Sequence, residues 1–145
     1  MSHSGKAGRI FAVAMLVVAA GCMKGGLNLK PGPVKFYDGP EAPAESLATL
    51  ENDANMFFAT IDGKDLRRWQ QSHDVLQVQV RPGTHVIVAG PSTRAGFVSM
   101  DAARIEFVAD AGHRYVVSRR VLGGSRSTEW TAVFTDVTAG KELLP

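Results

Sequence analysis

Residues 75–89 read VLQVQVRPGTHVIVA, and this stretch decides the fold class. From Leu76 to Val80 every second residue is apolar and the residues between are glutamines, a pattern typical of a strand that buries one face. Pro82-Gly83 then predicts a turn. Because the run 84–89 that follows is again β-rich, the short loop predicts a hairpin between the two runs.

Outward from this stretch, four more runs have the composition of strands, and Asp62-Gly63 and Ala111-Gly112 provide turn signals between them. Because no long helix separates the runs, a parallel α/β sheet is disfavoured. We expect an all-β fold, a small antiparallel β-sandwich of about six to seven strands, with a barrel as the alternative. The additional predicted strands are Met56–Ile61, Arg104–Val108, Arg114–Val121 and Glu129–Val137.

One short helix is predicted over Ser46–Glu51, since Leu47 and Leu50 are three residues apart on one helical face. Apolar residues on the inward side of the predicted strands should form the core. The candidates are Phe57, Phe58, Ile61, Leu76, Val78, Ile87, Phe107, Tyr115, Val117, Trp130 and Phe134.

The first 21 residues differ from the rest of the chain. Lys6 and Arg9 precede an unbroken apolar run of 11 residues, Ile10–Ala20. A basic start, an apolar segment of about 7–15 residues and small residues after it are the features of a secretory signal peptide. A membrane-spanning helix needs roughly 20 apolar residues, so residues 1–21 are predicted to be a signal peptide instead.

The run ends in Val18-Ala19-Ala20-Gly21-Cys22, which resembles the lipobox of bacterial lipoproteins, although Ala19 stands where the family prefers Leu. The resemblance implies cleavage between Gly21 and Cys22, a diacylglycerol on the Cys22 thiol and a fatty acid such as palmitate on the new amine. In Gram-negative lipoproteins an Asp after the lipidated Cys favours the inner membrane. Met23 stands there, so the resemblance implies the outer membrane. The alternatives are a simple signal peptide that leaves a soluble periplasmic protein, and an uncleaved anchor.

Residues 22–44 are rich in Gly and Pro and are predicted to be a tether, with a short edge strand around Val34–Tyr37; residues 45–145 are predicted to be the domain. A second resemblance follows from the order Tyr37-Asp-Gly-Pro40, Thr60-Ile-Asp-Gly63, Val80-Arg-Pro-Gly-Thr-His85 and Ala111-Gly-His-Arg-Tyr115. It resembles a family of small bacterial lipoproteins and, in its turns, PEGA-type and transthyretin-like β-sandwich modules. The resemblance implies a sandwich outside the cytoplasm and no catalytic residues.

Composition and charge exclude several classes of protein. Apolar residues make up 45% and charged residues 21%, which argues against a coiled coil or a disordered tail, and the single Cys excludes a disulfide framework. Sixteen basic against 14 acidic residues give a net charge of +2. Removal of Lys6 and Arg9 with the signal peptide would bring this to zero, so the total charge predicts no binding of nucleic acid or of an anionic membrane by the domain.

Residues suited to catalysis or metal binding are few. His85 and His113 each follow a turn containing Gly and open a predicted strand, so with Asp62 or Asp110 they could ligate a metal. The simpler interpretation is that each imidazole hydrogen-bonds a carbonyl of its turn, and we predict no metal and no cofactor. Because no nucleophile motif is found, the sequence favours a protein that is not an enzyme over a hydrolase or a metal-dependent enzyme.

The remaining candidates form a predicted binding surface, since Arg and Trp are favoured at binding hot spots. The alternative is that these arginines are solvated strand edges and that Trp130 belongs to the core. We therefore expect an envelope lipoprotein that binds or holds another envelope protein or peptidoglycan, with the membrane reached through the lipid. The residues of the surface are Arg67, Arg68, Trp69, Arg119 and Arg120.

Overall fold

A computed structural model describes residues 32–70, 75–93, 96–97, 102–124 and 129–143. The chain divides into two units, Met1–Lys30 and Pro31–Pro145, and the described residues all belong to the second. The predictions for the signal peptide, for Gly21 and Cys22 and for the first part of the tether lie outside the described residues.

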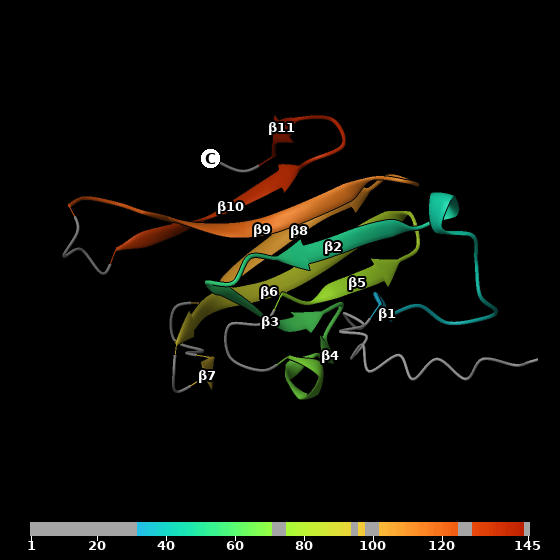
Figure 1. Ribbon diagram of the computed structural model, residues 1–145, viewed down its shortest axis with the longest axis horizontal. Coiled ribbons are helices and arrows are strands. Elements are labelled where there is room, and N and C mark those ends of the chain that lie inside the picture. Colours follow the sequence, from blue (N-terminus) through green and yellow to red (C-terminus); the bar gives the residue numbers. More distant parts are fainter. Residues whose placement is uncertain (1–31, 71–74, 94–95, 98–101, 125–128, 144–145) are drawn as a thin grey trace, which may run out of the picture. The chain divides into compact units, whose positions relative to one another are not determined.

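Two β-sheets make up the described part of the chain (Figure 1). The first sheet has the order β1-β5-β2-β9-β10-β11; in the second, β4-β3-β6-β7 are neighbours and β8 also pairs with β6. The all-β, sandwich-like prediction is confirmed. The strands of the first sheet are β1 (Val34–Lys35), β5 (Gln77–Val80), β2 (Ala48–Asn52), β9 (Arg114–Val121), β10 (Trp130–Asp136) and β11 (Lys141–Glu142). Those of the second are β4 (Lys64–Asp65), β3 (Met56–Ile61), β6 (Gly83–Thr93), β7 (Gly96–Phe97) and β8 (Ala103–Ala109).

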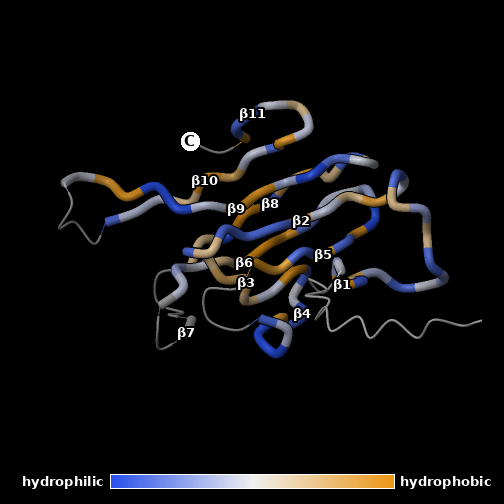
Figure 2. The backbone as a smooth tube through the Cα atoms, viewed as in Figure 1, coloured by the Kyte–Doolittle hydropathy of each residue, from blue (hydrophilic) through white to orange (hydrophobic). Residues whose placement is uncertain are grey.

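The core lies between the sheets, where alternate residues of each strand face one another. The rings of Phe107 in β8 and Phe134 in β10 lie 4.5 Å apart between centroids, and Tyr115 in β9 stacks on Phe134 at 5.5 Å. Apolar stretches therefore follow the strands, as Figure 2 shows. Every predicted core residue is buried except Trp130, which is partly buried and packs against the core.

The predicted hairpin around Pro82-Gly83 is wrong. β5 pairs with β1 and β2 in the first sheet, whereas β6 pairs with β3 and β8 in the second, so this turn carries the chain from one sheet to the other. Gly83 has φ 134°, a backbone conformation that would be strained in a residue with a side chain. An alternating pattern shows only that one face of a strand is buried. It does not identify the partner strand, because β5 and β6 bury their apolar faces in the same core from different sheets.

The helix predicted over Ser46–Glu51 is also wrong. A short 3₁₀ turn, η1 (Ala44–Ser46), precedes β2, in which Ala48, Leu50 and Asn52 are buried and the residues between are partly exposed. β2 lies inside the first sheet, antiparallel to β5 and parallel to β9. The short apolar pattern of this segment fits a helix as well as a strand. Pairing with β5 on one side and β9 on the other holds it as a strand.

The predicted edge strand in the tether is present as β1, which runs parallel to β5. Among the strand pairs of the described residues, β1 with β5 and β2 with β9 are parallel and the others are antiparallel. A second 3₁₀ turn, η2 (Arg67–Trp69), follows β4. β1 with the residues that follow it, the β3–β4 hairpin and η2 thus provide most of the candidate site.

Candidate functional site

Aromatic and basic side chains gather where β1, β4 and η2 meet. After β1, the Phe36 N–H donates to the Gln79 carbonyl at 3.0 Å, which holds the chain along the edge of the first sheet. In the second sheet, β3 turns into β4 through Asp62 and Gly63, with φ 50° and 74°. We call this surface the aromatic–basic patch, and its residues are Lys35, Phe36, Tyr37, Lys64, Arg68, Trp69 and Arg81.

One half of the patch is centred on Phe36 and Trp69. Their rings meet edge to face, with centroids 6.0 Å apart and planes at 86°. The Arg68 guanidinium lies 3.8 Å from the Trp69 ring centroid, and Lys64 Nζ lies 5.8 Å from that of Phe36. Buried Leu66 fixes η2 beneath them, because its N–H donates to the Ala59 carbonyl at 3.0 Å. Trp69 remains 38% exposed, so the ring is available to a partner.

The other half is centred on Tyr37. Lys35 Nζ and the Arg81 guanidinium lie 4.9 and 5.1 Å from its ring centroid. Arg81 also donates to the Asp38 carbonyl at 3.3 Å, while the Asp38 carboxylate pairs with Lys64 at 3.7 Å. Lys64 therefore connects the two halves.

Arg67 differs from its neighbour Arg68 in having a carboxylate partner. Its guanidinium and its backbone N–H both hydrogen-bond Asp65, and chiefly the side-chain bond lowers the pKa of Asp65 to about 2. The patch together with this pair and Asp38 holds five cations and two carboxylates, an excess of three positive charges. The local charge of the patch is thus strongly positive.

The predicted binding surface is divided in the structure. Arg67, Arg68 and Trp69 form η2 beside the second sheet, whereas Arg119 and Arg120 lie in β9 of the first sheet. Neighbouring strand residues point to opposite faces, so the two arginines of β9 do not act together. Arg120 donates to Glu142 of β11 at 2.8 Å.

The two histidines lie at the ends of one row of rings. His85 is 6.1 Å from Phe107, Phe107 is 5.2 Å from Tyr115, and Tyr115 is 6.2 Å from His113, all between centroids. Each imidazole pairs through Nδ1 with a different carboxylate at 2.7 Å, His85 with Asp62 and His113 with Asp136.

The two histidines are not arranged to share a metal ion, because each pairs with a different carboxylate. His85 Nε2 lies 2.7 Å from the Arg81 carbonyl, as predicted for an imidazole that holds its turn, whereas His113 contacts the Asp136 carboxylate of another strand. Asp110, the other proposed ligand, uses its backbone N–H to bond Tyr115 Oη at 2.9 Å. Within the ranges that the structure describes, no group of three or more His, Cys, Asp or Glu residues is placed to hold a metal ion.

Asp136 fastens the end of β10. Burial alone would raise the pKa of its carboxyl, but hydrogen bonds from the Ala139 N–H, from His113 and from the backbone of Thr138 outweigh burial and lower it. Its side chain is 7% exposed. The carboxylate is therefore a structural anion that stabilises the turn after β10.

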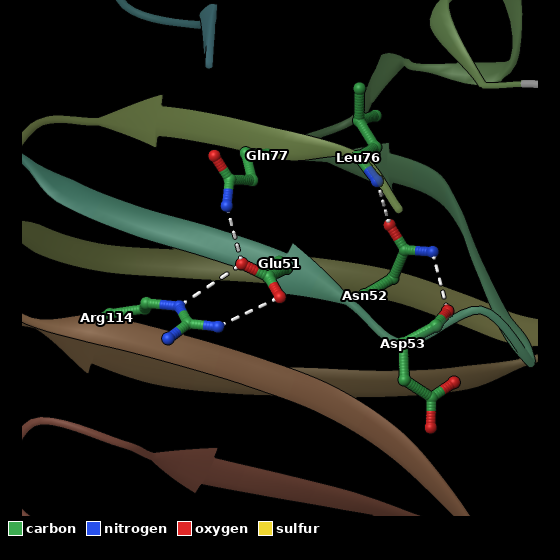
Figure 3. A network of polar contacts seen from close by, with 6 residues as sticks. All are labelled: Glu51, Asn52, Asp53, Leu76, Gln77 and Arg114. Carbon is green, nitrogen blue, oxygen red and sulfur yellow. Dashed lines mark hydrogen bonds and ion pairs between the residues drawn. The ribbon is translucent and has the colours of Figure 1, made fainter. Parts of the chain in front are cut away.

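A second polar network lies along β2 (Figure 3). Arg114 and Gln77 both donate to the Glu51 carboxylate, Arg114 through two nitrogens at 3.0 and 3.2 Å. The buried side chain of Asn52 donates to the Asp53 and Met56 carbonyls at 2.8 and 2.7 Å and accepts from the Leu76 N–H at 2.8 Å. Asn52 thus joins β2 to the start of β3 and to the segment before β5.

Sequence reasoning singled out Arg68 and Trp69 as candidates but not the other members of the patch. Lys35-Phe36-Tyr37 places a cation directly before two aromatic residues, which is a visible signal, but nothing in the sequence places this segment beside Trp69. The structural roles of Asn52 and Asp136 were also missed. Both depend on partners that are remote in the chain or formed by a turn.

No family model, no curated protein and no solved structure matches this chain. Among the described residues, no helix has the length and apolar character needed to cross a bilayer.

Proposed function

We propose that the chain is a lipid-anchored protein of the bacterial envelope, at the outer membrane rather than the inner, and that its β-sandwich acts by binding and not by catalysis. One observation carries the proposal. The only Cys of the chain, Cys22, follows directly on an 11-residue apolar run with a basic start and small residues at Ala20 and Gly21. The chemistry of lipidation needs this order, because the thiol must be at the membrane surface and the bond before it accessible to a peptidase.

The anchor would fix the protein firmly. Each CH₂ group that enters the bilayer contributes about 0.8 kcal/mol, and two or more acyl chains give stable attachment. A domain held in this way needs no span of its own, and residues 23–33 are left to connect it to the lipid. The domain then works within reach of the membrane.

The aromatic–basic patch is the surface that supports a binding role. It combines Trp69, which is 38% exposed, with an excess of positive charge, and neither feature is needed to close the core. Arg and Trp are the residue types that contribute most at interfaces. Another envelope protein with an acidic face, or peptidoglycan with its carboxylates, has the chemistry to meet such a surface.

The decisive experiment replaces Cys22 by Ser in the full chain expressed in a Gram-negative host. We expect the unaltered protein in the outer-membrane fraction of a density gradient, with a mature N-terminal peptide that starts at Cys22 and carries the mass of the lipid. Cys22→Ser should lose the lipid mass and the processing before residue 22. Met23→Ala is the matched control and should keep both. An unmodified thiol in the native protein would refute the anchor, and a soluble periplasmic chain cleaved after an Ala would replace it.

A further inference from the structure

The aromatic–basic patch lies next to the point where the chain enters the domain. Lys35 follows Cys22 by only 13 residues, which when fully extended span at most about 45 Å. A bilayer that holds Cys22 would therefore always be within this distance of the patch. A short connection of this kind raises the effective concentration of the two surfaces, so even a weak contact is populated.

We infer that the aromatic–basic patch docks on the anionic headgroups of the membrane that holds the anchor. The inference rests on the proposed function for the anchor. Lysine and arginine near an anionic lipid surface each favour binding about fivefold. Phe36, Tyr37 and Trp69 supply partly exposed rings of the kind that settle at the level of the headgroups.

The arrangement of cations over rings favours lipid phosphates over a sugar chain. Sugars bind aromatic residues by stacking on an open ring face. In the patch a cation lies over a face of each ring, Arg68 over Trp69, Lys64 over Phe36, and both Lys35 and Arg81 over Tyr37. The charged ends of these side chains lie against the ring faces, so a surface that approaches the patch meets positive charge together with the exposed parts of the rings.

A zero total charge for the mature chain does not oppose this contact. At 0.1 M salt the interaction between exposed charges decays over about 10 Å, so a membrane responds to the nearest charges and not to the sum. Positive charge is concentrated around β1, β4 and η2, and carboxylates such as Glu51 and Glu142 are paired with arginines of β9. Charge asymmetry within a neutral chain orients it on an anionic surface.

The test uses the mature chain, residues 22–145, with Cys22→Ser, which contains the whole unit Pro31–Pro145 and has no lipid. Its partitioning is measured by co-sedimentation with vesicles of phosphatidylcholine alone or mixed with phosphatidylglycerol, over a range of salt. We expect binding that requires phosphatidylglycerol and weakens as salt rises. Lys64→Gln with Arg68→Gln should reduce partitioning about 20-fold, since two charges are removed.

The control is Arg119→Gln with Arg120→Gln, which removes the same charge from β9 and should change partitioning less than twofold. Equal losses in the two double variants, or no dependence on phosphatidylglycerol, would overturn the inference. Binding to isolated peptidoglycan without binding to vesicles would overturn it in favour of a glycan partner. Because this chain carries no lipid, vesicle binding is measured independently of the mass at Cys22, and a failure of docking is distinguishable from a failure of the anchor.

Discussion

Buried and exposed polar side chains in this domain are used in opposite ways. Asn52, Gln70 and Asp136 are almost wholly buried, and each is tied to backbone groups of other segments. Gln70 is representative, because its amide accepts from the Phe58 N–H at 2.9 Å and donates to the Met56 carbonyl at 3.3 Å, as a neighbouring strand would.

The cationic residues of the aromatic–basic patch lie on the surface, where each contacts an aromatic ring. In the part of the chain that the structure describes, no buried side-chain N or O atom lacks a hydrogen-bond partner. The comparison teaches that the interior polar groups hold the fold together, while the polar groups of the patch are exposed and are those to which we assign binding. Stability measurements can separate the two classes.

The largest effect is expected at Asn52. Asn52→Ala leaves the buried Leu76 N–H without its side-chain acceptor and removes one of the two amide donors of the Met56 carbonyl, which keeps Gln70. The free energy of unfolding should fall by about 2–4 kcal/mol. Urea unfolding of residues 22–145 with Cys22→Ser measures this change. Gln77→Ala is the control, because this partly exposed amide bonds only the Glu51 carboxylate in Figure 3 and should cost less than about 1 kcal/mol. Similar losses of unfolding free energy in the two variants would contradict the difference drawn between buried and exposed polar side chains.

An intermediate effect is expected at Asp136. Asp136→Asn should lower the free energy of unfolding by about 1–3 kcal/mol near pH 6, because the Ala139 N–H and His113 lose a carboxylate. The pKa of Asp136 in the folded state lies below its ordinary value of 3.8. Its contribution is thus complete above pH 3.8 and is lost as pH falls below that value, so the curves of the two proteins should converge in acid.

The control for this prediction is Asp65→Asn, which removes an exposed ion pair with Arg67 that solvent screens. It should shift the urea midpoint near pH 6 much less than Asp136→Asn does. A gap between the unaltered protein and Asp136→Asn that stays constant down to pH 3 would contradict the role assigned to the carboxylate.

The smallest effect is expected in the patch. Lys64→Gln with Arg68→Gln should change the free energy of unfolding by no more than about 0.5 kcal/mol, since both side chains are exposed. Thermal unfolding followed by circular dichroism measures it, with Arg119→Gln and Arg120→Gln as the matched pair. A loss as large as that of Asn52→Ala would place the patch with the structural groups and remove the basis for its binding role.

Strand positions were largely predictable because burial of one face leaves a pattern of period two in the sequence. The six predicted strands are present as β3, β5, β6, β8, β9 and β10. Partners were not predictable from that pattern, as the step between sheets at Pro82-Gly83 shows. β2 was missed because the spacing of Leu47 and Leu50 fits one face of a helix as well as a strand with the residue before it. Only the pairing with β5 and β9 determines that the segment is a strand.

The candidate site was predictable only where its residues are adjacent in the chain. Arg68 and Trp69 are neighbours and were found, but Phe36 and Arg81 join them through the pairing of β1 with β5 and through the turn after β5. Arg119 and Arg120 resemble Arg67 and Arg68 in sequence, yet the extended backbone of β9 sends them to opposite faces. The residue types in the sequence therefore suggested a binding surface, and the strand topology determined which residues belong to it.

The parallel pairing of β2 with β9 has a consequence for the order of events during synthesis. Thr49 is opposite Arg114 and Asn52 is opposite Val117. β2 therefore pairs with a strand that is synthesised more than 60 residues later. Such high contact order slows folding. A nascent chain that has not yet released β9 from the ribosome cannot complete this sheet. For the exported protein that we propose, this delay would keep the chain unfolded while it crosses the membrane.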